Sequence, residues 1–254
     1  ATYSVQFTSN VNDECGVCGG DNSSCADCAG VPNGSAEMAD YWPDADGDGL
    51  GFGSVTETDF ALSFDGVNDY VYVPSNSSLN FGDGSITFEC WFKKPTTTHN
   101  YNTSLMSNYI TSTTPVFGLH IRGTQESEPG IVQVNYRTNQ GQTAEESCKS
   151  TFRIDDNQWH HVAGIKDVSK DSIYLYIDGQ LDKKSFIPVG DNDSYQGLAI
   201  GSGHLGRFMD IMVDNARVWN KALSHLEIQQ YMSTSPELDE EGLVAYWNFN
   251  EGNG

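Results

Sequence analysis

Apolar and polar residues alternate along most of the chain from residue 59 onward, and this period of two is typical of β-strands that bury one face. Ile86, Phe88 and Phe92 share one face of such a segment, whereas Thr87 and Trp91 share the other. Many short segments of this kind follow one another, separated by turn residues, which is the arrangement of an all-β sandwich. We therefore predict an all-β fold for residues 59–254.

The alternating segments predict strands at regular intervals. They are residues 60–64, 70–73, 85–92, 116–122, 131–137, 159–166, 173–177, 180–186, 198–201, 211–219 and 243–249. Asp178 and Gly179 separate two of them, and this pair supplies the positive φ angles of a tight hairpin turn. One helix interrupts the pattern, because Ser224 and Glu227 form a capping box that predicts a short helix ending at about Met232.

Residues 1–58 follow a different pattern. Residues 1–9 alternate, with Tyr3, Val5 and Phe7 on one side, and predict a strand without an evident partner nearby. Residues 10–58 are rich in Gly, Asp, Asn and Ser, and their few aliphatic residues cannot form a core. We interpret this stretch as an arm that crosslinks and bound ions hold in place. The chain then divides into residues 1–9, 10–58 and 59–254.

Three carboxylates lie at alternate positions of a glycine-rich turn in the arm, at Asp44, Asp46 and Asp48. They repel one another unless a cation lies between them, and calcium takes several oxygen ligands in loops of this kind. The backbone carbonyl of Leu50 is the natural next ligand. Val55 stands where an EF-hand requires a bidentate Glu, so the loop is not an ordinary EF-hand. The alternative is a solvated acidic turn without a metal.

Four of the six cysteines lie in the arm, and two lie in the β-rich part. The arm contains Cys15, Cys18, Cys25 and Cys28. Two disulfides of undetermined pairing explain this cluster in a secreted protein, and a zinc site is the alternative. Cys90 and Cys148 either form a third disulfide that closes a long loop or are buried free thiols.

The formal net charge of −22 argues against binding of nucleic acid or of an anionic membrane through a basic surface. No apolar run in the sequence is long enough to span a bilayer. The N-terminal residues lack the features of a signal peptide, and the C-terminal residues carry no anchoring motif. We therefore expect part of a longer or processed precursor that is secreted or displayed at the cell surface.

Seven motifs of the β-rich part occur in the order expected of a known family. They are ALSFDGVNDYV (61–71), FECWF (88–92), WHHVA (159–163), LYIDG (175–179), AIG (199–201), VDNARVW (213–219) and LVAYWNF (243–249). This order resembles a laminin G-like domain of the concanavalin A-like superfamily, over about residues 59–252. The resemblance implies a jelly-roll sandwich of two curved antiparallel sheets. The acidic loop and cysteine segment upstream resemble thrombospondin type 3 calcium loops and short cysteine repeats of large secreted surface proteins.

Members of this family mostly bind carbohydrates, glycosylated receptors or matrix proteins, often with a calcium ion at the rim of the sandwich. The resemblance makes Asp65, Asp69 and Asp214 candidate ligands of a second ion. Ile211 stands where the family usually has a glycine, three residues before the equivalent of Asp214, so the backbone there can depart from the family path. The alternative is that Asp69 and Asp214 cap turns or pair with Arg217.

The same sandwich also hosts glycosidases, which use two carboxylates that face each other across a cleft. The chain lacks their E-x-D-x-x-E strand. The adjacent acidic pairs at 145–146 and 155–156 would point to opposite faces of a strand. His161 shares a strand face with Trp159 and Ala163, which favours a core histidine over a catalytic one. We therefore expect no catalytic residues and a protein that is not an enzyme.

Two functions without catalysis remain. The first, which the sequence favours, is a calcium-stabilised structural or adhesive unit of a surface fibre or large adhesin. In that case the strand of residues 1–9 pairs with another copy of the chain or with another surface protein, unless it folds back onto its own sandwich. The second is a lectin-like module that binds glycans through rim loops and exposed aromatic residues such as Tyr101, Tyr109 and Tyr195.

Overall fold

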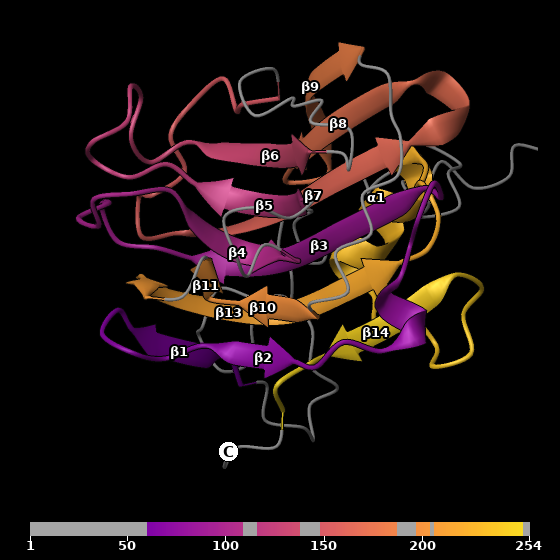
Figure 1. Cartoon of the computed structure of the whole chain (residues 1–254), viewed down its shortest axis with the longest axis horizontal. Helices are drawn as coiled ribbons and strands as arrows, with labels where there is room; N and C mark the ends of the chain where they lie inside the picture. The colour runs from indigo at the N-terminus through magenta and orange to yellow at the C-terminus, as the bar shows by residue number, and fades with distance from the viewer. Residues whose placement is uncertain (1–59, 109–115, 138–147, 187–196, 204–205, 251–254) are drawn as a thin grey trace, which may run out of the picture. The chain divides into compact units, whose positions relative to one another are not determined.

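The computed structural model describes residues 60–108, 116–137, 148–186, 197–203 and 206–250. All of them belong to one compact unit. Their strands form two antiparallel sheets that pack face to face. Figure 1 shows the strands of both sheets overlaid, with α1 (His225–Ser233) behind β3 (Ile86–Lys93). The prediction of an all-β jelly-roll sandwich with one short helix is confirmed.

The larger sheet has seven strands in the order β1-β13-β3-β7-β8-β9, and β14 also pairs with β13. Besides β3, its strands are β1 (Leu62–Asp65), β13 (Asp210–Trp219), β7 (Trp159–Asp167), β8 (Ser172–Ile177), β9 (Gln180–Phe186) and β14 (Leu243–Trp247). β1 pairs with the first half of β13 and β14 with its second half, while β3 runs along the other edge of β13.

The smaller sheet has five strands in the order β2-β10-β4-β5-β6. They are β2 (Val71–Val73), β10 (Leu198–Ile200), β4 (Thr103–Ser107), β5 (Val116–Ile121) and β6 (Val132–Arg137). A short hairpin of β11 (Ser202–Gly203) and β12 (Arg207–Phe208) follows β10, and two 3-10 turns occupy Ser77–Leu79 and Val168–Lys170. Both sheets join segments that are far apart in the sequence, since β1 pairs with β13 and β2 with β10.

Alternation predicts most of these strands, with bounds that differ from the observed ones by at most two residues. The capping box of Ser224 and Glu227 also starts α1 as predicted. The pattern does not predict β4, β11 or β12. All five side chains of β4 are buried, although three of them are Thr or Ser, and β11 packs against this strand. Each face of β4 mixes Thr or Ser with an apolar residue, so the strand carries no period-two signal.

The core lies between the two sheets and consists of their inward-facing apolar side chains. Phe88 of β3 meets Phe117 of β5 edge to face, with ring centroids 5.0 Å apart. Gly164 of β7 allows the sheets to approach closely, since a Cβ there would lie 3.0 Å from Leu119 Cδ2 and 3.1 Å from Val134 Cγ2. Dense packing of this kind fixes how the two sheets are placed against each other. Within the described residues, no helix has the length and apolar character that crossing a bilayer requires.

Cys90 and Cys148 are buried free thiols, so the disulfide expected between them is wrong and the alternative holds. Cys148 Sγ lies 4.0 Å from the carbonyl oxygen of Ile173 on β8. Ile173 is in register with Ile86 of β3, two strands away, and Cys90 lies four residues further along β3. Bonded cysteines have Cα atoms within about 7 Å, which this placement does not allow. Burial raises the pKa of both thiols.

Candidate functional site

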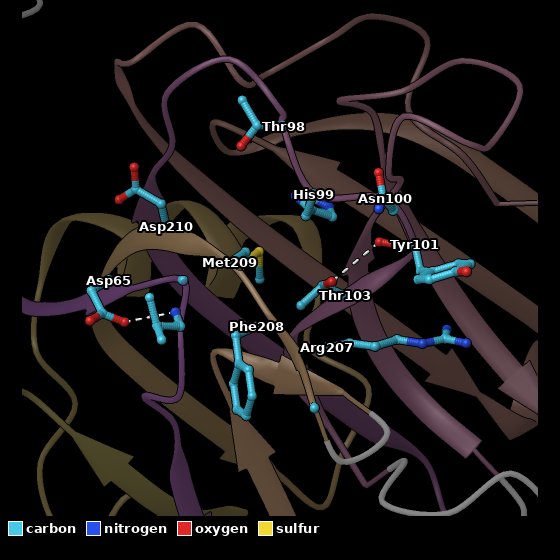
Figure 2. A pocket seen from close by; sticks show the side chains of 13 residues that line it. Asp65, Thr98, His99, Asn100, Tyr101, Thr103, Arg207, Phe208, Met209 and Asp210 are labelled. Atoms are coloured by element: carbon cyan, nitrogen blue, oxygen red, sulfur yellow. Dashed lines mark hydrogen bonds between the residues drawn. The ribbon is translucent and has the colours of Figure 1, made fainter.

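A cavity of about 500 Å³ opens at the rim of the sandwich, and we call it the rim cavity. Its walls are residues 65–67 at the end of β1 and in the turn that follows, residues 98–101 and 103 before and in β4, and residues 206–210 at β12 and the start of β13. Its volume lies within the range of roughly 300–1,000 Å³ that is usual for small-molecule sites. Figure 2 shows Asp65 and Asp210 on one side of the rim cavity and Tyr101 and Arg207 on the other.

The turn after β1 places Asp65 at the edge of the rim cavity. Gly66 has a φ of 77°, and a Cβ there would lie 2.8 Å from the backbone nitrogen of Asp210, so only glycine lets this turn rest on the start of β13. Asp65 Oδ1 accepts a hydrogen bond from the Val67 N–H at 2.7 Å. Asp69 Oδ2 accepts one from the Asp65 N–H at 3.1 Å. These bonds fix the Asp65 carboxylate within the turn.

The wall formed by residues 98–101 is anchored to the segment that follows β5. The Thr124 N–H donates to the carbonyl oxygen of His99 at 2.9 Å. The Gln125 N–H donates to the carbonyl oxygen of Asn100 at 3.0 Å. Gly123 touches the same wall, since a Cβ there would lie 2.5 Å from the carbonyl carbon and oxygen of Asn100. The conformation of this wall therefore depends on backbone contacts with residues 123–125.

Aromatic and cationic groups form the opposite side of the rim cavity. The guanidinium carbon of Arg207 lies 4.9 Å from the centroid of the Tyr101 ring, and Nη1 of Arg207 donates to the carbonyl oxygen of Asn102 at 3.5 Å. Tyr101 is nevertheless 49% exposed. The ring of Phe208 lies 6.1 Å from that of Tyr70. Such rings stack on apolar ligand faces, and a guanidinium group donates several hydrogen bonds in fixed directions.

A buried lysine lies behind the wall of the rim cavity. Lys94 is 1% exposed, and its Nζ donates to the carbonyl oxygen of Asp210 at 3.0 Å. Burial lowers the pKa of Lys94, although the carboxylates of Asp210 and Asp155 oppose this. Burial and the Lys94 ammonium group lower the pKa of His99 to about 4, so the ring of His99 is neutral at neutral pH. Two cationic side chains therefore lie at the rim cavity: Lys94 is buried behind the wall, and Arg207 is part of the lining.

The three carboxylates expected at the rim do not converge. Asp65 and Asp69 share the turn after β1, but Asp214 lies four residues beyond Asp210 in β13 and is fully buried. Asp214 accepts hydrogen bonds from the backbone N–H and the side-chain amide of Asn215 at 2.6 and 2.7 Å. In the part of the chain that the structure describes, no three His, Cys, Asp or Glu side chains are grouped to hold a metal ion. These residues therefore do not fit one shared ion, and Asp69 caps a turn as in the alternative interpretation.

The other predicted sites lie outside the described residues. They are the loop of Asp44, Asp46, Asp48 and Leu50, the cysteines Cys15, Cys18, Cys25 and Cys28, and the strand face of Tyr3, Val5 and Phe7. Tyr109 and Tyr195 also lie there, whereas Tyr101, the third aromatic residue expected to contact a glycan, lines the rim cavity. Calcium binding by the loop, the crosslinks of the arm and assembly through residues 1–9 stay predictions.

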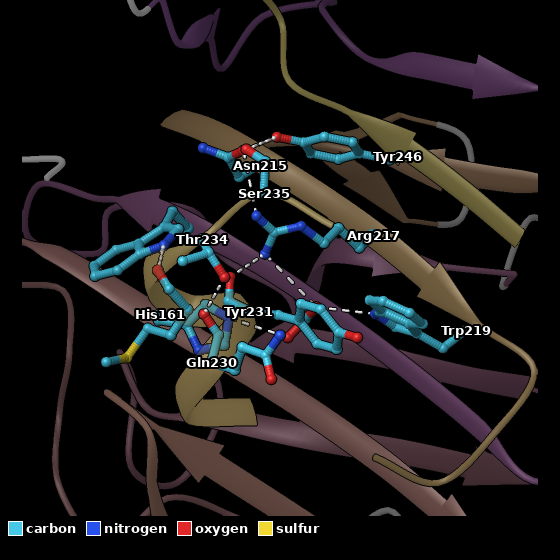
Figure 3. Close-up of polar contacts among 12 residues, drawn as sticks. His161, Asn215, Arg217, Trp219, Gln230, Tyr231, Thr234, Ser235 and Tyr246 are labelled. Atoms are coloured by element: carbon cyan, nitrogen blue, oxygen red, sulfur yellow. Dashed lines mark hydrogen bonds and ion pairs between the residues drawn. The ribbon is translucent and has the colours of Figure 1, made fainter. Parts of the chain in front are cut away.

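A second group of polar side chains lies under α1, on the outer face of the larger sheet (Figure 3). Glu89 Oε1 accepts a hydrogen bond from the Trp219 indole N–H at 2.9 Å. Glu89 Oε2 lies 3.3 Å from Nε2 of His161. Arg217 Nη1 lies 3.6 Å from Glu89 Oε1 and donates to the carbonyl oxygen of Tyr231 near the end of α1 at 2.7 Å. We call these five residues the helix clamp.

The helix clamp cannot contact a substrate. Glu89 and His161 are 0% exposed and Arg217 is 2% exposed. The prediction that His161 is a core histidine is therefore confirmed. Burial opposes ionisation of Glu89, but the adjacent His161 ring, the charge of Arg217 and the hydrogen bond from Trp219 outweigh it and lower the pKa of the Glu89 carboxyl. The helix clamp is a buried ion pair that joins α1 to β3, β7 and β13.

His160 lies between two carboxylates at the start of β7. Its Nδ1 is 2.9 Å from Asp178 Oδ2, and its Nε2 is 3.2 Å from Asp156 Oδ1. Burial disfavours the charged ring, but the two carboxylates outweigh burial and raise the pKa of His160. A raised pKa means that the protonated ring stabilises the fold. That contribution is complete below the ordinary pKa of histidine and is lost as pH rises through the raised value.

We expect His160→Gln to lower the free energy of unfolding by about 0.5–1 kcal/mol at about pH 5.5, the usual size for a partly exposed ion pair, and to have little effect at about pH 9. Urea denaturation of both proteins at each pH measures the difference. Asp156→Asn serves as a partial control, because it removes one of the two carboxylates and should reduce the same pH dependence. An equal loss of stability at both pH values would contradict the assignment.

Sequence reasoning missed Asn100, Arg207 and Asp210, which line the rim cavity together with Asp65. They come from segments that the alternation leaves as loops or strand ends. Only the pairing of β1 with β13 places Asp65 opposite Asp210. The available signal was the position of Asp210 directly before a predicted strand, since polar residues at strand ends gather at the rim of a sandwich.

Comparison with protein families matches residues 65–229 to a laminin G family described as the concanavalin A-like lectin/glucanases superfamily. Comparison with curated proteins gave no match.

Solved structures with low sequence identity share the fold. A putative carbohydrate binding protein from Bacteroides ovatus has a TM-score of 0.59 and 20% identity, over 76% of this chain and 53% of that chain. Domain 4 of AbnA, an extracellular arabinanase from Geobacillus stearothermophilus solved with arabinotriose, has a TM-score of 0.53 and 16% identity, over 72% of this chain and 82% of that chain. The ligand binding domain of botulinum neurotoxin serotype D, solved with N-acetylneuraminic acid, has a TM-score of 0.54 and 16% identity, over 70% of this chain and 42% of that chain. The chain thus spans about half the length of the first of these proteins, and these identities show a shared fold alone.

Proposed function

Because this chain belongs to the concanavalin A-like lectin/glucanase superfamily, we propose that it is a lectin-like module that binds a glycan in the rim cavity without transforming it. The lining of that cavity carries the proposal. An exposed tyrosine ring, a guanidinium group and two carboxylates surround one volume of about 500 Å³. A well-formed pocket with a few convergent polar groups is the default candidate for a ligand site.

The groups of the rim cavity match the chemistry of a sugar. A pyranose ring has an apolar face, on which the exposed ring of Tyr101 stacks. Its hydroxyl groups both donate and accept hydrogen bonds. Asp65 and Asp210 accept such bonds, and Arg207 and the amide of Asn100 donate them. Because two carboxylates stand against one surface guanidinium group, the lining favours a neutral, hydroxyl-rich glycan over an acidic one.

The structural neighbours support a carbohydrate ligand by what their names state. One is described as a carbohydrate binding protein, and two were solved with arabinotriose or N-acetylneuraminic acid. We place the module outside the cell, where glycans are displayed and where a net charge of −22 keeps a protein soluble. This proposal replaces the fibre or adhesin unit that the sequence favours, because the described residues build a binding cavity and the structural neighbours include a protein described as carbohydrate binding.

The placement of the carboxylates is the reason to propose binding without catalysis. Among the described residues that line the rim cavity, carboxylates come only from Asp65 and Asp210, which lie opposite each other on paired strands at one side. Glycosidic cleavage needs carboxylates on both sides of the scissile bond. The facing wall supplies Thr98, Asn100 and Tyr101 instead. Incubation with the bound oligosaccharide should therefore release no shorter product.

The test is a glycan array with the full chain, followed by calorimetric titration of the best neutral oligosaccharide. We expect Tyr101→Ala to weaken binding about tenfold through the lost stacking surface. We expect Arg207→Ala to weaken it by about tenfold or more, since a charge-assisted hydrogen bond is lost.

Tyr72→Ala is the matched control, because Tyr72 is also 49% exposed but lies on β2 outside the rim cavity. This variant should bind with the affinity of the wild type. The proposal fails if Tyr72→Ala abolishes binding while Tyr101→Ala does not, since the ligand then lies on the smaller sheet. It also fails if no glycan on the array binds.

A further inference from the structure

We infer that the rim cavity binds its ligand without a metal ion, because the ammonium group of Lys94 supplies a fixed positive charge behind the carboxylates of this rim. The statement about the ligand rests on the proposed function. The statement that the rim cavity binds no metal ion does not depend on it. The family resemblance implies a calcium ion at this rim, and the residues present there do not fit one. The side chains that decide this are the carboxylates of Asp65 and Asp210 and the ammonium group of Lys94.

The chain holds the Lys94 ammonium group in one place. Lys94 directly follows β3, and its side chain is 1% exposed. Its Nζ donates to the carbonyl oxygen of Asp210 at 3.0 Å, while its own carbonyl oxygen accepts from the Asn157 N–H at 2.8 Å. Both ends of the residue are therefore fixed by backbone partners. The ammonium group lies at the strand end that carries Asp210 into the rim cavity.

The second carboxylate near Lys94 already has partners of its own. Asp155 is 4% exposed and accepts hydrogen bonds from the Thr97 N–H at 2.6 Å and from Arg153 at 2.9 and 2.7 Å. The charge of Asp155 is therefore balanced largely by Arg153. The Lys94 ammonium group thus lies beside Asp210, whose backbone carbonyl oxygen accepts its hydrogen bond.

A divalent ion at the same edge would meet two obstacles. The first is charge, because an ion bound by Asp65 and Asp210 would lie near the Lys94 ammonium group, and like charges repel strongly where water is partly excluded. The second is ligand number, since calcium takes about six to eight oxygen ligands. Among the described residues that line the rim cavity, only Asp65 and Asp210 bring carboxylates, since Asp69 is not in the lining and Asp214 lies buried further along β13. Two carboxylates are fewer than the oxygen ligands that calcium usually takes, and the Lys94 ammonium group lies beside them.

A calcium titration of the full chain tests the metal part. The protein used is a triple variant, Asp44→Asn, Asp46→Asn and Asp48→Asn, which removes the predicted loop site and leaves the rim unchanged. We expect no saturable binding of calcium up to about 5 mM, which exceeds the dissociation constants of weak extracellular sites. Saturable binding that disappears when Asp65→Asn is added would overturn the inference. This measurement needs no glycan, so it is decided independently of the proposed function.

Glycan titrations in chelator and in calcium test the ligand part. The same dissociation constant within about twofold is expected in both buffers, since the binding groups are protein side chains. A tenfold or larger loss of affinity in chelator would refute a metal-free rim. If no glycan binds in either buffer, the proposed function fails, and the calcium titration alone decides the inference.

Replacing the lysine tests its role directly. We expect Lys94→Met, which keeps the length and loses the charge, to weaken glycan binding about tenfold in chelator, because the backbone of Asp210 loses the hydrogen bond that holds the start of β13 at the rim cavity. Lys93→Met, at the preceding and half-buried position, should leave the affinity unchanged. Equal affinities for Lys94→Met and the wild type would contradict the role given to the ammonium group. If Lys94→Met does not fold, the calcium titration still tests the inference.

Discussion

Replacing Arg217 by methionine is expected to lower the free energy of unfolding by about 3–5 kcal/mol, the usual cost of removing one partner of a buried ion pair. In this variant the Glu89 carboxylate stays at 0% exposure, and its remaining partners among the described residues are His161 and Trp219. It also removes the bond to the carbonyl oxygen of Tyr231, which holds the end of α1. Urea denaturation at neutral pH, followed by tryptophan fluorescence, measures the loss.

Two controls separate the helix clamp from a general effect of losing an arginine. Arg207→Met removes a partly exposed arginine and should cost less than about 1 kcal/mol. The double variant Glu89→Gln and Arg217→Met should be more stable than Arg217→Met alone, because no unpaired charge then remains buried. A loss below about 1 kcal/mol for Arg217→Met would show that Glu89 is not ionised in the folded protein.

The second large effect is expected at the wall of the rim cavity. Gly123→Ala should weaken glycan binding by at least about tenfold and also lower stability by about 1–3 kcal/mol, as overpacking does. A Cβ at this position would lie 2.5 Å from the backbone of Asn100, and backbone atoms cannot yield as side chains do. Residues 98–101 must therefore move, although no group that contacts the ligand is changed. Calorimetric titration and thermal unfolding measure the two effects.

Gly164→Ala is the matched control for this variant. Its Cβ would meet the side chains of Leu119 and Val134 at 3.0 and 3.1 Å, inside the core and away from the rim cavity. It should lower stability and leave the affinity for the glycan unchanged. If Gly123→Ala binds the glycan as tightly as the wild type does, the wall of residues 98–101 is not part of the binding site.

The fold follows from the sequence where the two faces of a strand differ in polarity. β3 is buried on both faces, yet it alternates because Ile86, Phe88 and Phe92 face the core while Thr87 and Glu89 lie on the face under α1. The capping box starts α1 through local hydrogen bonds alone. The pattern does not predict β4, because Thr103 and Ser107 are buried although they are polar. Gly118, whose Cβ would lie 2.5 Å from that of Ser107, shows why only small residues fit there.

The candidate site follows from the sequence only in part. Tyr101 is expected because an exposed aromatic residue suits a glycan site. Asp65 is expected at the rim through the family resemblance, but as the ligand of an ion. The place of Lys94 does not follow, because its neighbour Asp210 is more than a hundred residues away and only the β13 pairings bring it near. For the same reason Asp214 is expected at the rim but lies buried within β13. Long-range pairing, which local pattern does not encode, decides which polar residues share a site.

A crystal structure of the full chain with the best oligosaccharide from the array tests the central claim most directly. The account predicts a sugar ring against Tyr101, with hydroxyl groups bonded to Arg207 and to Asp65 or Asp210. A sugar bound on the outer face of the smaller sheet, with the rim cavity holding only water, would contradict it.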